Sequence, residues 1–549
     1  MKLFSLALPT LILASTSTLL INNEDAEKTK QYIVMADSSE IALNSVIKSG
    51  AQINEKLPLI NGVVADLTAK QLAKLAKTGN LKISRNAQVA VSSFAPIQNA
   101  KQDYVQSNGA NGNEVDTTLI EQTFAKNLQL SGTMGNDIAV AVLDTGIQPM
   151  SGLSNNAQGD SRILGTYDVF ADAFSTQNSD ENGHGTHISS IIASSDQDLD
   201  SDYFGMAPNV NLVGVKAFDQ SGAGSYVNVI KGIEWAIAYK DVFNIRVLNM
   251  SFSAPAQSFY WDDPVNVAVM KAWQAGIVVV ASAGNRGSDE PTIGVPGNVP
   301  YIITVGAATD SNTAFDTSDD GVATFSSAGP TVEGFAKPEV VAYGSKLVGK
   351  MPGNADIPVM YPSTHAAGEY YSMSGTSQAT GVVSGAVALL LSANPNLTPD
   401  QIKCRLIDTA NPLLNGTDGA VSALLQGSGL INVEEAVNSD ADFCANQNMN
   451  IEADILGSEH YVGPLMEYDG SGGDPATDGN LWRDGNLWRD GNLWRDGNLW
   501  RDGNLWRDGN LWRDGNLWRD STLGDNAETW MDTNSVVDAS AVIAVHPVM

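Results

Sequence analysis

Basic residues are scarce in this chain. Its 549 residues include 31 Lys and Arg against 62 Asp and Glu, which gives a formal net charge of −31. A protein this acidic is repelled by phosphate backbones and by anionic lipid surfaces. The composition therefore argues against nucleic acid or an anionic membrane as a partner. The hydrophobic share of 43% is enough to bury a sizeable core.

Cysteine is rarer still, with two residues, Cys404 and Cys444. This usage fits export to an oxidising compartment. A bridge between them would close a loop of about 40 residues and contribute roughly 4 kcal/mol by restricting the unfolded chain. We expect the disulfide, and two free thiols are the alternative.

Long apolar runs are nearly absent. The exception is the N-terminus, where Met1-Lys2 precedes an apolar stretch over residues 3–20. A positive start followed by an apolar segment is typical of a secretory signal. We expect residues 1–22 to be a signal peptide and the mature protein to be secreted (extracellular or periplasmic). No integral membrane segment is expected after signal cleavage.

Histidine is the third scarce type, with five in the chain, and one of them belongs to a set of three motifs. These are residues 142–146 (VLDTG) with Asp144, residues 183–187 (GHGTH) with His184, and residues 374–377 (SGTS) with Ser377. A serine hydroxyl needs a base to take its proton, and the base needs a carboxylate that fixes its tautomer. The three motifs together are the parts of a nucleophilic hydrolase.

In this order the motifs resemble those of the subtilisin-like serine proteases, or subtilases. The resemblance implies Ser377 as nucleophile, His184 as general base and Asp144 as the orienting carboxylate, acting on polypeptide substrates. Asn285, in the motif SAGN at residues 282–285, would donate to the oxyanion. A turn asparagine is the alternative for Asn285 taken alone. No cofactor is required for this chemistry.

Two other histidines, His187 and His365, are not assigned to the catalytic chemistry. The resemblance makes His187 structural, although it belongs to the same motif as His184. We interpret His365 as a surface residue.

Alternating apolar strands and helices run from about residue 114 to residue 437. Such alternation predicts an α/β fold, a parallel sheet with helices on both faces. Asp144 comes at the end of a strand, where functional groups collect in such sheets. Ser377 precedes an apolar helix, so it gains free backbone N–H groups and the positive end of the helix dipole.

The family binds extended peptide as an added strand. The resemblance assigns its cleft walls and substrate contacts here to Gly222, Ala223, Gly224, Ser251, Phe252, Ser253 and Gly284. Ser253-Ala254 stands where the family often has Gly-Gly, so the first specificity pocket would be narrower. Arg286 follows Asn285. It would favour an acidic or polar substrate residue next to the scissile bond, or it is a solvent-exposed surface charge.

Residues 23–113 resemble the family's inhibitor-type propeptide followed by a processing linker. Apolar and helical patterns alternate as strand, helix, strand, helix and strand up to residues 88–91. We expect a small α+β domain here that acts as the protein's own intramolecular inhibitor. The polar stretch 98–113 suits a processing linker.

The family often carries structural calcium, so a calcium site is possible here too. Asp172, Asp180 and Glu181 form an acidic loop before His184, and carboxylate oxygens are calcium ligands. A solvated loop is the alternative, and no set of metal ligands is assigned.

The resemblance ends at about residue 437. We expect a linker over residues 438–478, seven copies of GNLWRD over 479–520 and an acidic tail over 521–549. The repeats suit a binding or surface-attachment appendage, or a recent expansion without fixed structure. The leading hypothesis is a secreted serine endopeptidase made as an autoprocessed precursor. The alternative is a catalytically weak scaffold that acts as an adhesion or carbohydrate-binding protein through these repeats.

Overall fold

The computed structural model describes residues 28–91, 117–288, 291–311, 313, 315–414, 421–463 and 465, together with the backbone of 546–548. The expected signal peptide, the 98–113 linker and the GNLWRD repeats lie outside these residues. The chain divides into two compact units. The first ends at Arg85, and the second holds residues 57–60 and everything from Asn86 onward.

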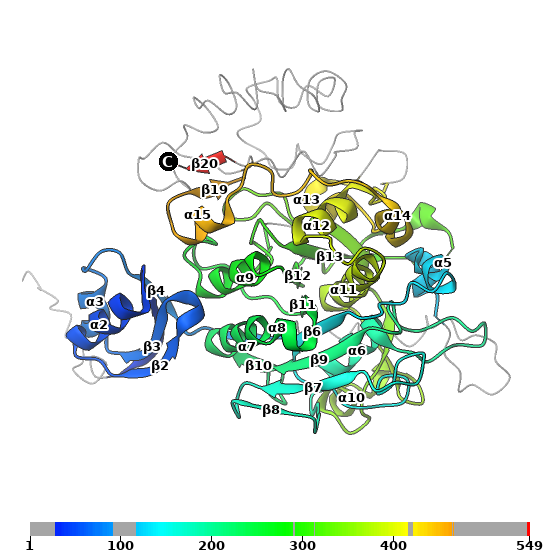
Figure 1. Ribbon diagram of the computed structural model, residues 1–549, viewed down its shortest axis with the longest axis horizontal. Coiled ribbons are helices and arrows are strands. Elements are labelled where there is room, and N and C mark those ends of the chain that lie inside the picture. Colours follow the sequence, from blue (N-terminus) through cyan, green and yellow to red (C-terminus); the bar gives the residue numbers. More distant parts are fainter. Residues whose placement is uncertain are drawn as a thin grey trace, which may run out of the picture. The chain divides into compact units, whose positions relative to one another are not determined.

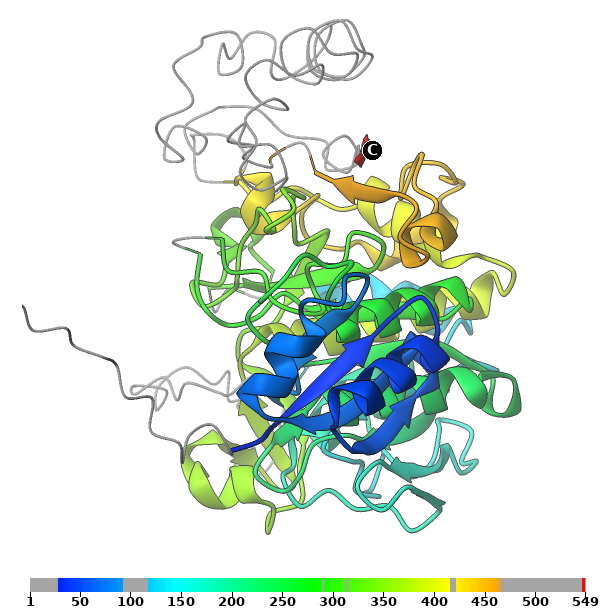
Figure 2. The same ribbon diagram turned by 90° about the vertical axis from the view of Figure 1, so that its left-hand side faces the viewer.

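The first unit is a four-stranded sheet with two helices. The strand order is β2-β3-β1-β4, with β1 at Lys30–Met35, β2 at Ile53–Leu57, β3 at Gly62–Leu67 and β4 at Lys82–Arg85. The helices are α2 at Ser39–Ser49 and α3 at Ala69–Leu75, and they contact each other and β3. Figure 2 turns this unit, in blue, toward the viewer.

Local sequence explains the boundaries of α2. Ser38 caps its start by accepting from the N–H of Ile41, and Gly50 ends it in the left-handed conformation with φ of 90°. Val34, Val46 and Val63 are fully buried between helices and sheet.

Two features of residues 23–113 differ from the sequence expectation. The strands β2 and β4 were not expected. The segment Gln88–Ala90 is a strand (β5), but it belongs to the second unit and pairs there with β10 at Ala223–Ser225 rather than with the four-stranded sheet.

The second unit is built on a nine-stranded sheet of order β14-β13-β12-β11-β6-β9-β7-β8, with β15 also paired to β13. Its strands are parallel except at the β7–β8 and β13–β14 pairs. Their bounds are Ala139–Asp144 (β6), Ile163–Asp168 (β7), Ala173–Ser175 (β8), Asn211–Lys216 (β9), Ile245–Met250 (β11), Val278–Ser282 (β12), Ile303–Thr309 (β13), Gly321–Val322 (β14) and Val340–Tyr343 (β15).

Helices cover both faces of this sheet (Figure 1). On one side lie α6 (His184–Ala193) and α11 (Thr376–Ala393), which contact each other; on the other lie α7 (Tyr226–Ala238) and α9 (Pro264–Gln274), which also contact each other. The expected α/β architecture is confirmed. The core lies between the sheet and these two helical layers.

Shorter helices surround this framework. They are α4 (Leu119–Gln122), α5 (Ala125–Leu130), α8 (Lys240–Phe243), α10 (Asp356–Met360), α12 (Pro399–Asp408), α13 (Ala423–Gln426), α14 (Val433–Asn438) and α15 (Ile451–Ile455). A three-stranded sheet joins β16 (Leu347–Lys350), β18 (Tyr370–Met373) and β17 (His365–Ala367), and β19 (His460–Val462) pairs with β20 (His546–Val548).

Helix α11 is long and apolar enough to span a membrane, but 89% of its most apolar window is buried inside the protein. It contacts α6 and strands β11, β12, β13 and β15. It is therefore the central core helix of this unit, and its first turn carries Ser377.

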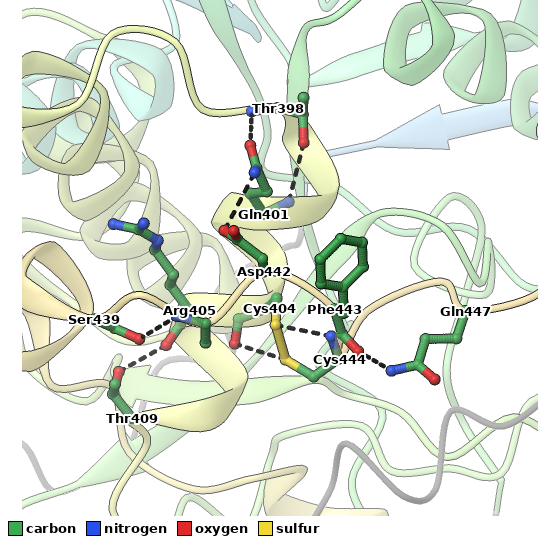
Figure 3. The surroundings of a disulfide bond; sticks show 11 residues. Thr398, Gln401, Cys404, Arg405, Thr409, Ser439, Asp442, Phe443, Cys444 and Gln447 are labelled. Atoms are coloured by element: carbon green, nitrogen blue, oxygen red, sulfur yellow. Dashed lines mark hydrogen bonds between the residues drawn. A yellow bond between two sulfur atoms is a disulfide. The ribbon is translucent and has the colours of Figure 1, made fainter.

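Residues 438–463, expected to belong to a linker, instead fold against the domain. A disulfide joins Cys404 on α12 to Cys444 (Figure 3). The buried Asp454 accepts hydrogen bonds from the hydroxyls of Tyr260 and Tyr301, at 2.5 and 2.9 Å. The α/β domain thus extends beyond the expected boundary at residue 437.

Candidate active site

Asp144 is the last residue of β6 and is fully buried. Its Oδ1 accepts from the Thr145 N–H and contacts the Nδ1 of His184, both at 2.8 Å. This bond fixes the orientation of the imidazole. It leaves Nε2 as the ring nitrogen that is available to accept a proton.

His184 is the first residue of α6. Two glycines, Gly146 after Asp144 and Gly185 after His184, are required for the contact between these two side chains. Gly146 has φ of 127°, and a Cβ on it would collide with the Ser179 carbonyl oxygen, while a Cβ on Gly185 would collide with the Gly146 carbonyl oxygen. The Gly-rich motifs therefore let two backbones approach closely enough for the carboxylate and the imidazole to meet.

The pKa of His184 is raised above its ordinary value. Burial opposes the charged imidazolium, but the charge and hydrogen bond of Asp144 favour it and prevail, with a smaller contribution from Asp180. An imidazole that becomes a stabilised cation on taking a proton is suited to act as a general base.

Ser377 is the second residue of α11 and is buried. Its hydroxyl donates to the carbonyl oxygen of Ser251 at 2.9 Å. The Nε2 of His184 has no hydrogen-bond partner among the residues the structure describes. A serine hydroxyl and an unpartnered imidazole nitrogen, the two groups that a nucleophile–base pair requires, are thus both found in the described residues, with the hydroxyl turned toward Ser251.

Asn285 lies in the loop after β12 and is tied to the start of α11. Its Oδ1 accepts from the backbone N–H and the hydroxyl of Thr376, each at 2.9 Å. With the oxygen occupied, the Nδ2 group is the remaining donor of this amide, and it makes no hydrogen bond to any residue that the structure describes. The arrangement can stabilise a developing oxyanion.

The proposed cleft walls are β10 with the preceding Gly222, and the segment 251–253 that follows β11. The chain segment 86–91 adds to one of them: β5 pairs antiparallel with β10, and the Val91 N–H donates to the Gly222 carbonyl at 3.0 Å. Val91 also forms an antiparallel bridge with Phe252. An extended chain therefore lies between the two segments that contain the predicted substrate contacts.

Ser253 and Gly284 lie together behind the second wall. A Cβ on Gly284 would stand 2.9 Å from the Ser253 Oγ, and one on Gly294 would collide with the same oxygen. The Ser253 Oγ is buried and lacks a hydrogen-bond partner among the described residues. Arg286 is exposed and donates to the Thr292 carbonyl at 2.5 Å.

Other candidates lie apart from this cluster or have different partners. The buried His187 contacts the Tyr371 carbonyl through Nε2 at 3.0 Å, and burial lowers its pKa to about 3. His365 is exposed. Among the described residues no group of three or more His, Cys, Asp or Glu side chains is placed to hold a metal ion.

The carboxylates of the acidic loop before His184 are paired with donor groups of the protein itself. Asp172 accepts from the Tyr167 hydroxyl at 2.5 Å, Glu181 pairs with Lys216, and Asp180 accepts from five donors. The sequence analysis placed Ser251 in the cleft and Thr376 in a motif, but it did not predict their hydrogen bonds to Ser377 and Asn285. The Ser251 carbonyl belongs to the backbone, so no residue type signals its role.

Comparison with known proteins connects this geometry to a family. Residues 135–430 match the model of the subtilase family, a span that contains Asp144, His184, Asn285 and Ser377. The chain belongs to the subtilase family.

Two subtilase relatives span most of the chain or of their own length. The serine protease AprX of Bacillus subtilis is 39% identical over 329 residues, which cover 58% of this chain and 71% of AprX. The thermostable alkaline protease of Halalkalibacterium halodurans is 31% identical over 434 residues, covering 78% of this chain and 99% of that protein. The chain is therefore a serine peptidase of the subtilisin type.

A solved structure shares the subtilase fold. Fervidolysin from Fervidobacterium pennivorans, described as a keratinolytic enzyme related to subtilisin, aligns with a TM-score of 0.56 at 22% identity. The match covers 76% of this chain and 62% of fervidolysin. At this identity the comparison supports the fold alone.

Proposed function

We propose that this subtilase is a secreted serine endopeptidase that uses Asp144, His184 and Ser377 as its catalytic triad. The observation that carries the proposal is the 2.8 Å contact between the His184 Nδ1 and the Asp144 Oδ1, with Nε2 left unpartnered among the described residues. An oriented imidazole with a free nitrogen and a serine at a helix start are components that acyl transfer requires.

The chemistry follows from these positions. The Ser377 hydroxyl turns from Ser251 to His184, gives its proton to Nε2 and attacks the substrate carbonyl carbon. The Nδ2 of Asn285 and the backbone N–H of Ser377 stabilise the oxyanion. His184 then returns the proton to the leaving amine, which departs and leaves an acyl-enzyme. Water, deprotonated by His184, hydrolyses the ester and regenerates Ser377.

Polypeptide is the proposed substrate, bound as a strand between Gly222–Gly224 and Ser251–Ser253. Support comes from the chain itself, since the segment 86–91 adopts this position. Main-chain hydrogen bonds of this type give affinity without demanding a particular side chain. Ser253 and Gly284 would shape the first specificity pocket.

The same segment supports autoprocessing. A chain that pairs with β10 up to Val91 is held as a substrate or a product would be. We propose that the N-terminal part of the chain inhibits the enzyme in cis and that the first cut falls shortly after Val91, nearer than the expected linker over residues 98–113. Secretion and a structural calcium ion remain parts of the proposal, and the chemistry itself requires no cofactor.

Fluorophosphonate labelling of the secreted protein tests the proposal. We expect a mass adduct on Ser377 and a mature N-terminus shortly after Val91. The Ser377→Ala variant should accumulate as an unlabelled, uncut precursor. A folded, mature wild-type protein without an adduct would contradict the triad. An adduct on a protein that keeps its N-terminal unit would contradict autoprocessing.

A further inference from the structure

We infer that Asp180 is a positioning residue that holds the Asp144 turn and the His184 helix in one arrangement. The inference rests on the proposed triad. Asp180 contacts neither of the two catalytic side chains through a hydrogen bond, yet its carboxylate joins the residues next to each of them.

The carboxylate of Asp180 is 3% exposed and accepts five hydrogen bonds. Its Oδ1 accepts from the Thr145 hydroxyl at 2.8 Å and from the N–H groups of Asn182 and Gly183 at 3.2 and 2.9 Å. Its Oδ2 accepts from the N–H and the hydroxyl of Thr186 at 2.8 and 2.6 Å. Thr145 follows Asp144, and the other three residues flank His184.

The two hydroxyls have fixed directions. The Thr145 Oγ1 accepts from the Gly185 N–H and the Thr186 Oγ1 accepts from the Gln148 N–H, both at 2.9 Å. Each hydroxyl has one proton, so that proton goes to Asp180. Burial raises the pKa of Asp180, but all five hydrogen-bonding groups around it donate, and this environment opposes protonation of the carboxyl.

This arrangement also supplies a missing helix cap. Gly183 stands at the N-cap of the ten-residue helix α6 and has no side chain to accept from it. Asp180 accepts from the N–H of Gly183 and of Thr186 instead, and its charge lies at the positive end of the helix. A single carboxylate therefore caps the helix that begins with His184 and anchors that helix to the turn after Asp144.

Asp180 also acts on the charge of His184. The charged groups that favour the His184 imidazolium are Asp144 first and Asp180 second. His187, on the next turn of α6, is neutral above acidic pH because burial lowers its pKa to about 3. Removing the charge of Asp180 while keeping its shape should therefore lower the pKa of His184 as well as loosen its position.

The test compares Asp180→Asn with Asp172→Asn, a matched change in the same acidic loop whose carboxylate contacts Tyr167. Rates are normalised to the active sites that react with fluorophosphonate. We expect kcat/KM of Asp180→Asn to fall about 100-fold, since small misplacements at an active site cost this much. The acid limb of its pH profile should move to lower pH. Asp172→Asn should match the wild type.

A purely structural role would lower the fraction of folded enzyme and leave the pH midpoint unchanged. Folded Asp180→Asn with wild-type kcat/KM and midpoint would overturn the inference. If Asp180→Asn does not fold, Thr145→Val removes one of the five donors and keeps the charge. It should lower kcat/KM without moving the midpoint, and an unchanged kcat/KM would overturn the inference. A wild-type enzyme that fails to label would instead reject the triad, and the inference with it.

Discussion

The Ser377 hydroxyl donates to the Ser251 carbonyl oxygen, 2.9 Å away, while the Nε2 of His184 has no partner among the described residues. For the proposed chemistry the hydroxyl must leave the Ser251 carbonyl and turn to the imidazole. The antiparallel bridge between Val91 and Phe252 places the next residue of a bound chain opposite Ser251. A substrate N–H that donates to this carbonyl would displace the hydroxyl and so release the nucleophile.

The role of Asn285 predicts a loss in turnover. Asn285→Ala should lower kcat about 10²- to 10³-fold, equivalent to about 2.7–4 kcal/mol, because one oxyanion donor is removed. KM should change little, since the oxyanion forms only in the transition state. Steady-state kinetics on a peptide substrate measure both. A raised KM with unchanged kcat would show that Asn285 supports substrate binding instead.

The raised pKa of His184 predicts the position of the acid limb. The base must be neutral to accept the serine proton, so activity is lost as the pH falls through the pKa of His184. We expect the midpoint of kcat/KM to lie above the ordinary histidine value of about 6.5. A pH profile of the mature enzyme checks this. A midpoint below that value would mean that burial outweighs the effect of Asp144.

The position of Ser253 predicts a limit on the size of the substrate side chain that the first specificity pocket accepts. Ser251 and Ser253 flank Phe252, which bridges to Val91, so in an extended segment their side chains point to one side, and we expect the side chain of the substrate residue opposite Ser251 to lie there too. Ser253→Gly removes the hydroxyl that lies against Gly284 and Gly294. We expect kcat/KM for a large aromatic residue before the cut, relative to alanine, to rise about tenfold.

A peptide series that varies this one substrate residue measures the Ser253→Gly ratio. Ser318→Gly, on the exposed 3₁₀ turn at Thr317–Asp319, serves as the control and should leave the ratio unchanged. An unchanged ratio in Ser253→Gly would show that this hydroxyl does not bound the pocket.

The disulfide predicts a difference in thermal stability. Cys404 and Cys444 are 40 residues apart, and a crosslink across such a loop contributes roughly 4 kcal/mol. Replacing both by serine should lower the Tm by several degrees. Reductant should lower the Tm of the wild type toward that of the variant and leave the variant unchanged. Equal Tm values with and without the bridge would contradict its stabilising role.

The sequence predicted those features of the fold and the site that depend on short stretches of the chain. The α/β fold followed from alternating apolar segments, and the turns around Asp144, His184 and Ser377 followed from short motifs whose glycines permit close backbone contact. The strand at Gln88–Ala90 was also visible as a pattern. Its partner was not, because pairing with β10 depends on an edge more than 130 residues further along the chain.

Other features depend on three-dimensional context that no short pattern contains. The strand β2 carries Asn54, Glu55 and Lys56, so it lacks the apolar run by which the neighbouring strands were recognised. Asp180 was a calcium candidate because it is acidic, whereas the structure surrounds it with donors from both sides of the site. The direction of the Ser377 hydroxyl is a torsion angle and leaves no trace in the sequence.

The bond between Cys404 and Cys444 has a further consequence for an enzyme that cuts polypeptides, since its own surface loops are potential substrates. The two sulfurs turn residues 404–444 into a covalent ring. A single nick anywhere within that ring opens it but leaves both fragments attached through the bridge. The segment containing α15 and β19 would then stay attached to the domain. The enzyme would remain one covalently linked molecule although its polypeptide chain has been cut.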